Sequence, residues 1–482
     1  MTENKTSEWK DAEVEIEYVR PRSQIGLFGA VAFGMGSMIG SGIFISPKGA
    51  LQNAGSPGMS LVMWALCGIL SLLMGLVYGE LGTLVPLSGG DYTYIRKGLG
   101  SVPAFLAVWI YTLFGSTGSM AVLSLVFADY LLALLFGSCQ PPDIMRQIIA
   151  ALMIITLCIT NVISVTFGAY TQIICTVAKT LALIVISIGG IVFLCEGSVE
   201  NLQNMFKDSS TGVTGYSLAI YSCMFAYHGY SRIGEIAEEL ENPKQNIPRA
   251  VIISVIIVTM VYVITNLSYF VLLPKDEFLH SSAVAYDWGL KGIAPVAFLI
   301  PLSVMCSVYG ASNGNGFSTG RVMFSAARAG HFPEVMSFLH VQTSVPVVSI
   351  VVMHAISLIM LAAGDISVLI NFLSFVTFIV VLMTTMALLR LRYEMHKNKV
   401  QHDGFKTPII IPIVTALICI FMIVSPLVNN PRIEFLYGSG IVIFGLIIYV
   451  PLVHFQLSVP GVGSCTTFLQ LLCNVSPTQK VD

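Results

Sequence analysis

Charged side chains are scarce in this chain of 482 residues. Asp, Glu, Lys and Arg together make up 10% of it, and the formal net charge is −2. Nucleic-acid binding draws on a surplus of basic residues, so this balance argues against a nucleic-acid partner. Hydrophobic residues make up 55% of the chain, and the mean hydropathy is +0.82. Most of such a surface faces lipid, which predicts an all-α polytopic membrane protein.

Motifs of catalytic, metal and cofactor chemistry are also missing from the sequence. No Cys/His cluster has the spacing of zinc ligands, and the glycine run after Phe33 lacks dinucleotide spacing and follows no strand. The runs 310–314 and 316–320 both fit the hydrolase pattern G-x-S-x-G, but they lie inside an apolar helical span instead of a strand-turn-helix elbow. The sequence therefore predicts no enzyme, no metal and no cofactor.

Apolar segments of membrane-spanning length recur along the chain, because a hydrocarbon layer of about 30 Å needs about 20 helical residues. About twelve are expected, near residues 26–45, 59–82, 104–136, 147–165, 171–195, 215–240, 250–273, 293–327, 345–363, 366–391, 408–428 and 434–455. Lys and Arg gather on the side of the N-terminal tail, so both termini are expected in the cytoplasm. The charged residues 1–25 and the segment 456–482 are expected to be cytoplasmic tails, and no cleaved signal peptide is expected.

Two of these spans are interrupted by residues that disfavour helix. The first carries four glycines between Gly34 and Gly42, and the sixth carries the run 225–230 with a glycine and a histidine. Broken backbone at membrane depth is tolerated only where it lines a cavity, and paired breaks point to a transport site.

The two breaks offer complementary charges. A helix restarting at Ser41 and Gly42 favours a carboxylate, while free carbonyls near Phe225 and Ala226 accept an ammonium. The pair predicts a receptor for an α-amino acid. The alternative is that the glycines only permit close helix packing, which accounts for one glycine-rich span more easily than for two.

Two further residues attract attention. Lys179 lies well inside the fifth span, and its ammonium is expected near the first break, where it could replace a bound sodium ion; alternatively it reaches an interface. Cys139 lies in a short outer loop and is the only cysteine clearly placed in an oxidising medium, which suggests an intermolecular disulfide or, alternatively, an unpaired thiol. Glu80 and Arg232 indicate either a cytoplasmic ion-pair gate or solvated helix ends.

Four runs form a specific motif set: 36–44, 46–49, 225–227 and 238–243. Together they resemble the amino-acid, polyamine and organocation superfamily, and more closely the light subunits of heteromeric amino-acid transporters, the L-type amino-acid transporter family. The similarity extends from about Gly26 to the last span. The resemblance implies a LeuT-like 5+5 inverted repeat within a transporter domain at 26–455, with broken helices 1 and 6. Its repeats are expected at about 26–195 and 215–391, with extra helices at 408–428 and 434–455.

The resemblance also implies residue roles. Phe225 matches an aromatic gate, Lys179 a lysine that replaces a sodium site, and Cys139 the cysteine that bonds a single-span glycoprotein heavy chain. The carboxylate-binding break is matched by Ile39, Gly40, Ser41, Gly42 and Ile43.

Departures from the family pattern bear on the substrate. His228 stands where carriers of cationic amino acids have an aspartate and carriers of large neutral ones a glycine, so cationic substrates are disfavoured. The histidine could bond a polar side chain, stack on an aromatic ring or, when protonated, attract a carboxylate; alternatively it only packs against Tyr227. Thr377 and Phe378 stand where relatives have asparagine and tryptophan, which alters the pocket wall.

The expected function is sodium-independent amino-acid antiport at the plasma membrane by the light chain of a disulfide-linked heterodimer. Neutral substrates are expected, with large or aromatic side chains favoured. The alternatives are a small-neutral or acidic amino-acid carrier of the same fold and a proton-coupled carrier. An ion channel or a membrane enzyme has less support.

Overall fold

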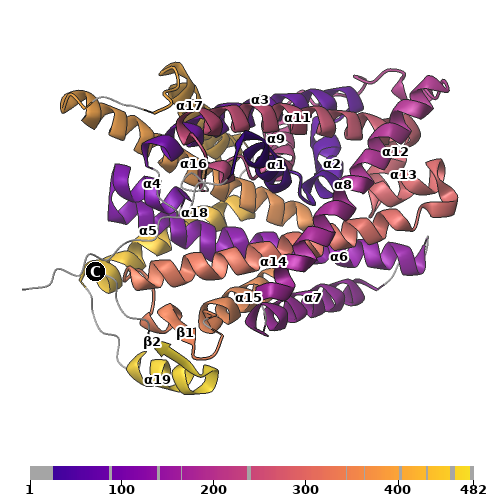
Figure 1. Cartoon of the computed structure of the whole chain (residues 1–482). Coiled ribbons are helices and arrows are strands. Elements are labelled where there is room, and N and C mark those ends of the chain that lie inside the picture. Colours follow the sequence, from indigo (N-terminus) through magenta and orange to yellow (C-terminus); the bar gives the residue numbers. More distant parts are fainter. Residues whose placement is uncertain are drawn as a thin grey trace, which may run out of the picture.

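The computed structural model describes residues 25–85, 90–137, 142–163, 165–235, 240–343, 345–362, 364–400, 404–429, 432–455 and 462–477. Nearly all of this is helix, and the helices pack into one bundle (Figure 1). The sheet content of the described ranges is one antiparallel pair, β1 (Phe338–His340) with β2 (Val475–Pro477). The prediction of an all-α polytopic membrane protein is confirmed.

A helix lies at each of the twelve segments predicted to span the membrane. In chain order they are α1 (Leu27–Met38) with α2 (Gly42–Ala54), α3 (Pro57–Leu84), α5 (Ser101–Ile110) with the π-helix η1 (Tyr111–Ser116) and α6 (Thr117–Phe136), α7 (Asp143–Ile163), α8 (Val165–Cys195), α9 (Val213–Tyr227) with α10 (Arg232–Glu235), α11 (Pro243–Leu272), α14 (Leu299–Arg328), α15 (Val347–Leu361), α16 (Ile366–Lys397), α17 (Ile410–Asn429), and α18 (Ile433–Ile448) with the π-helix η6 (Tyr449–His454).

Shorter elements connect these helices. They are α4 (Gly90–Leu99), α12 (Lys275–His280), α13 (Val284–Gly292), α19 (Val462–Cys473) and the 3₁₀ turns η2 (Glu200–Leu202), η4 (Ala294–Val296) and η5 (Glu334–Ser337).

Eight helices in the described ranges are long and apolar enough to cross a membrane, and the bent pair α1–α2 makes nine. The expected twelve are reached only if α9 with α10, α14 and α15 also cross. Helices α9 and α15 are each 15 residues long, shorter than a full membrane crossing. The third, α14, carries serines and asparagines, and some of these face the central cavity described below.

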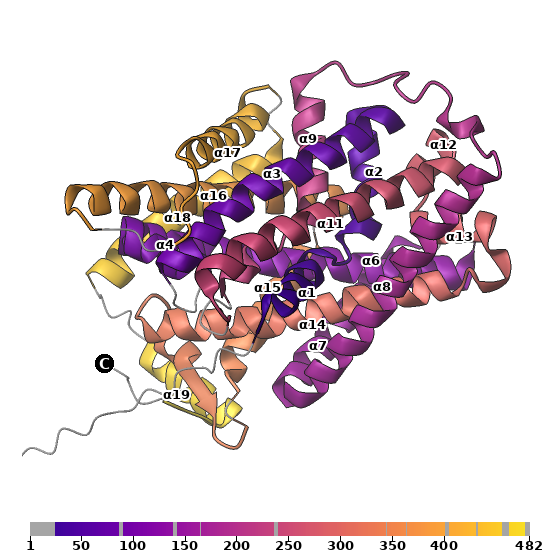
Figure 2. The same ribbon diagram turned by 45° about the horizontal axis from the view of Figure 1, so that its top comes forward.

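The outer and inner faces of the helices differ as a bilayer requires. On α8, Leu181, Ile184 and Ile188 lie three and four residues apart on one face of the helix and are about half exposed. Leu183 and Ile186 of the same helix are buried. Apolar residues on both faces fit a helix with lipid on one side and protein on the other. Inside the bundle, α11 packs against α1 and α3, and α2 packs against α9 (Figure 2).

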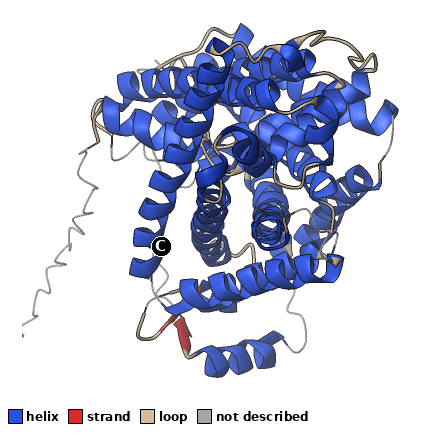
Figure 3. Cartoon of the chain, turned by 90° about the vertical axis from the view of Figure 1, so that its right-hand side faces the viewer, coloured by secondary structure: helices blue, strands red, loops and turns tan. Residues whose placement is uncertain are grey.

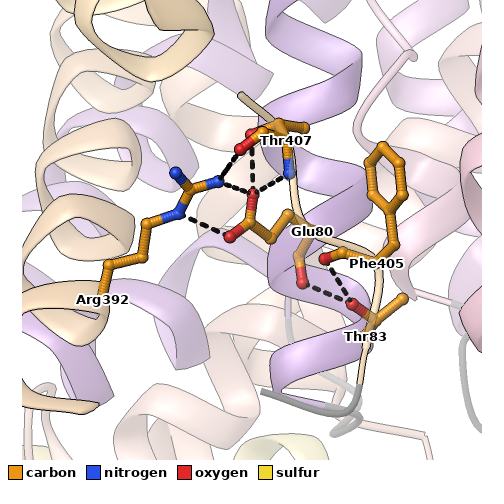
Figure 4. A network of polar contacts seen from close by, with 5 residues as sticks. All are labelled: Glu80, Thr83, Arg392, Phe405 and Thr407. Carbon is orange, nitrogen blue, oxygen red and sulfur yellow. Dashed lines mark hydrogen bonds and ion pairs between the residues drawn. The ribbon is translucent and has the colours of Figure 1, made fainter. Parts of the chain in front are cut away.

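A buried polar network ties α3 to α16 and to the segment before α17 (Figure 4). Glu80 is fully buried and forms a two-point ion pair with Arg392, whose side chain is 8% exposed. The backbone N–H of Thr407 donates to Glu80 at 2.9 Å and its hydroxyl at 2.7 Å, while Arg392 donates to the Thr407 carbonyl at 2.7 Å. We call Glu80, Arg392 and Thr407 the latch. The interpretation of Glu80 as a solvated helix end is therefore wrong.

The C-terminal part of the chain folds back on the bundle. Strand β2 pairs with β1, which lies between α14 and α15, in the register Leu339 opposite Ser476 (Figure 3). Val475 is buried with Phe338 and Val348. Sequence patterns did not predict this contact, because each strand has only three residues.

Candidate functional site

The first break separates α1 from α2, whose axes differ by 53°. Helix α1 ends at Met38 and α2 begins at Gly42, and the N–H of Gly40 donates to the carbonyl of Met38 at 2.7 Å. Ser41 precedes α2 without making a side-chain cap hydrogen bond. The start of α2 thus lacks a side-chain cap, and helix N-termini of this kind attract anions.

The second break follows α9, which ends at Tyr227. The chain turns at His228 and Gly229, and α10 begins at Arg232. Gly229 has a φ of +131°, and a Cβ at this position would lie 2.5 Å from the carbonyl oxygen of Ser37. A side chain is therefore excluded both by backbone conformation and by the first break. The interruption starts later than predicted, since Phe225 and Ala226 lie in the last turn of α9.

The two breaks touch each other. A Cβ on Gly42 would lie 2.5 Å from the Cα of Ala226, so close packing, the alternative considered above, does explain this particular glycine. Tyr262 of α11 is fully buried, and its hydroxyl lies 2.7 Å from the carbonyl oxygen of Met38 and 2.9 Å from that of Ala226. One side chain thus joins the end of α1 to the end of α9.

A cavity of about 620 Å³ lies beside the two breaks. Most of the residues predicted for the site line it: Gly40, Ser41, Gly42, Lys179, Phe225, Ala226, His228, Thr377 and Phe378. Ile39 and Ile43 do not line it, because both side chains are buried in the main apolar core. Cys139 lies outside the described residues. The roles of all these residues remain predictions.

Lys179 reaches the first break from α8. Its side chain is only 5% exposed, and Nζ donates to the carbonyl oxygen of Gly36 at 3.3 Å. The interpretation that this lysine reaches an interface is therefore wrong. A buried ammonium next to the carbonyls of a broken helix has the position expected of a fixed cation.

His228 lies against the third span as well as beside Tyr230. Its ring stacks on Tyr111 with centroids 5.8 Å apart and planes 23° apart, and Nε2 lies 3.4 Å from the Tyr111 hydroxyl oxygen. Tyr230 meets the histidine edge-on at 6.4 Å. The interpretation that His228 only packs against Tyr227 is wrong, and the stacked pair forms part of the cavity wall.

Sequence reasoning missed the contribution of the third and eighth spans. The π-helix η1 brings Tyr111 and Ser116 to the cavity, and Asn315 and Ser318 of α14 face them. The amide of Asn315 donates to the Ser116 carbonyl at 2.8 Å, at the point where η1 continues into α6. The signal was present as small polar residues inside apolar spans, including the second G-x-S-x-G run, at 316–320.

The cavity wall carries positive charge. Among the lining residues that the structure describes, Lys179 and Arg232 are cationic, and none is a carboxylate. No group of three or more His, Cys, Asp or Glu able to hold a metal ion occurs in the part of the chain that the structure describes. Backbone dipoles, hydroxyls and two cations suit the binding of a small polar solute.

The fold and the cavity define a multi-pass membrane protein of the LeuT-like type with a central cavity. The model of the amino acid permease family matches residues 25–452. The chain is 36% identical to the b(0,+)-type amino acid transporter 1 of Mus musculus over 97% of this chain and 96% of that protein. It is 38% identical to the cystine/glutamate transporter of Homo sapiens over 89% and 84% of the two chains.

A third relative is the large neutral amino acids transporter small subunit 2 of Mus musculus, 35% identical over 90% of this chain and 82% of that protein. This chain belongs to the amino acid permease family. The resemblance found in the sequence motifs is confirmed, and the relatives are transporters, not enzymes.

Proposed function

We propose that this protein is a sodium-independent exchanger of amino acids with a preference for neutral substrates. The observation that carries the proposal is the contact of the two breaks at Gly42 and Ala226 beside a cavity of about 620 Å³. The start of α2 suits an α-carboxylate, and the end of α9 suits an α-ammonium. Phe225 closes over the bound substrate, and the bundle then rocks to open the other side.

Tyr262 refines where the ammonium binds. The carbonyl oxygen of Ala226 already lies within hydrogen-bonding distance of the Tyr262 hydroxyl, which leaves one lone pair of that oxygen for the substrate. Free carbonyls of the last turn of α9 complete the ammonium site.

The side-chain preference follows from the charges around the cavity. A lysine or arginine substrate would meet the positive charges of Lys179 and Arg232 and, among the described lining residues, no carboxylate, which disfavours its burial. The stacked rings of Tyr111 and His228 favour large or aromatic neutral side chains. The relatives include both a cystine/glutamate transporter and a large neutral amino acids transporter, so relatives named for acidic and for neutral substrates share this fold.

An acidic amino acid is the second candidate substrate. Lys179 and Arg232 would attract a side-chain carboxylate, and His228 would add to this attraction when protonated. A proton-coupled carrier would show uptake stimulated by acid, with His228 as the first residue to replace.

Sodium independence is proposed from Lys179. Its ammonium lies on the Gly36 carbonyl, where a bound metal cation would perform the same electrostatic task. A permanently attached cation removes the need for a co-transported one.

Partnership with a single-span glycoprotein heavy chain is proposed from Cys139 and from the relatives, one of which is named a small subunit. Cys139→Ser should abolish a reducible high-mass band on non-reducing gels while the chain itself stays intact. Persistence of that band would refute the disulfide. The same proposal places the protein in the plasma membrane with both termini in the cytoplasm.

Trans-stimulated efflux from proteoliposomes tests the function. Vesicles are preloaded with labelled leucine, phenylalanine, alanine, aspartate or arginine and assayed with and without sodium, using the wild type, His228→Gly and His228→Asp. Efflux should require an external amino acid, ignore sodium and favour the neutral substrates, and His228→Asp should admit arginine. Sodium-driven efflux, or a wild type that prefers arginine, would refute the proposal; a preference for aspartate would support the second candidate.

A further inference from the structure

A second hollow of the molecule lies away from the central cavity. It is a groove of about 710 Å³ between the last turns of α16 and the segment that leads into α17, and it shares no lining residue with the central cavity. Its walls are formed by Leu389, Arg392, Tyr393 and His396 on α16 and by Lys406, Thr407, Pro408 and Ile409 before α17. We call this hollow the basal groove.

Three basic side chains line this wall, beside the phenol of Tyr393. They are Arg392, His396 and Lys406, and none of the lining residues that the structure describes is a carboxylate. The latch engages Nε and Nη2 of Arg392, so Nη1 takes no part in it and points away from Glu80 (Figure 4). A guanidinium that is held in place by a buried carboxylate presents its remaining donors at little cost in entropy. Arg392 is thus a prepared donor for an anion.

The mouth of the basal groove continues into an apolar surface. Ile409, Ile410, Ile413 and Leu417 are 55%, 60%, 42% and 60% exposed and follow one another from the groove along α17. Helix α17 is apolar enough to cross a membrane, so this row faces acyl chains. A ligand that fills both regions carries an anionic head and an apolar tail.

We propose that the basal groove binds the headgroup of an anionic phospholipid. Phosphate oxygens accept from Nη1 of Arg392 and from Nζ of Lys406, His396 supplies a further donor, and the acyl chains lie along the exposed row of α17. On the proposed orientation this lipid belongs to the cytoplasmic leaflet. Because Arg392 and Thr407 belong to both the latch and the basal groove, the bound lipid steadies the contact between α3, α16 and the segment before α17.

Lipid retention measures this site without reference to transport. The full chain is reconstituted with phosphatidylcholine and a minor fraction of phosphatidylserine, extracted into detergent, and the retained lipids are counted by mass spectrometry. Phosphatidylserine should be enriched over phosphatidylcholine in the wild type. Lys406→Gln should lower that enrichment about fivefold, because it removes the ammonium that contacts the headgroup phosphate inside the basal groove, and His396→Gln should lower it as well.

The matched control is Lys397→Gln, which removes the same charge from an exposed residue next to His396 that does not line the basal groove. It should retain phosphatidylserine as the wild type does. Equal enrichment of the two lipids in the wild type, or equal losses in Lys406→Gln and Lys397→Gln, would overturn the proposal. Inorganic phosphate at millimolar concentration should displace the retained phosphatidylserine less completely than soluble short-chain phosphatidylserine does. Equal displacement by the two would assign the site to free phosphate and overturn the proposal of a lipid ligand.

Discussion

Removing the hydroxyl of Tyr262 tests whether the two breaks act together. This hydroxyl lies 2.7 Å from the Met38 carbonyl and 2.9 Å from the Ala226 carbonyl, yet it carries only one proton. The two acceptors share that proton, so the loss corresponds to one hydrogen bond, worth about 1 kcal/mol. The ring packs against Trp64 at 5.5 Å and against Tyr227 at 5.0 Å, and phenylalanine keeps these contacts.

We therefore expect Tyr262→Phe to lower the exchange rate at limiting substrate by about fivefold, with little change in the amount of folded protein. The assay is counterflow of a labelled amino acid in proteoliposomes, normalised to protein inserted. Tyr269→Phe is the control, because Tyr269 lies on the same helix, is fully buried, and its hydroxyl has no hydrogen-bond partner among the described residues.

The reasoning is refuted if the two variants exchange equally well. It is also refuted if Tyr262→Phe loses activity only in proportion to a loss of folded protein, since the hydroxyl would then serve stability and not the geometry of the breaks.

Three further perturbations follow from the same structure. Lys179→Ala removes a charged donor from the Gly36 carbonyl, so transport should fall at least about tenfold at unchanged surface expression, and a fully active variant would disprove the fixed-cation role. Glu80→Gln removes the counter-charge of the Arg392 guanidinium, which is 8% exposed, and should destabilise the protein by about 3 kcal/mol in thermal unfolding. The double variant Glu80→Gln with Arg392→Gln should recover part of that stability. Stability losses of the two single variants that simply add in the double variant would contradict the pairing. Burial, and secondarily the charge of Arg96, lowers the pKa of His331 in the loop after α14 below its ordinary 6.5. The stability that neutral His331 contributes is therefore full above pH 6.5 and falls as the pH drops toward the folded-state pKa. His331→Gln should flatten the fall in melting temperature between about pH 7 and 5, and an unchanged profile would exclude His331 as its source.

The sequence by itself determined the class of protein and the positions of the long helices. Lipid imposes a fixed length and an apolar composition on any crossing helix, so each of the twelve predicted segments coincides with a helix. Glycines at Gly42 and Gly229 indicated breaks, because backbone groups at membrane depth cannot be left unpaired outside a cavity. The position of Lys179 inside its span likewise predicted a contact with the first break.

Only the tertiary structure decided which residues meet across long stretches of chain. Glu80 and Arg392 are 312 positions apart, and no periodicity in a sequence encodes such a pair. The stacking of Tyr111 on His228 brings the start of the π-helix η1 against the second break, across 117 positions of the chain, and the hydrophobic pattern does not encode it. Local composition sets where helices form in lipid, whereas the shape of the cavity arises from distant side chains that packing brings together.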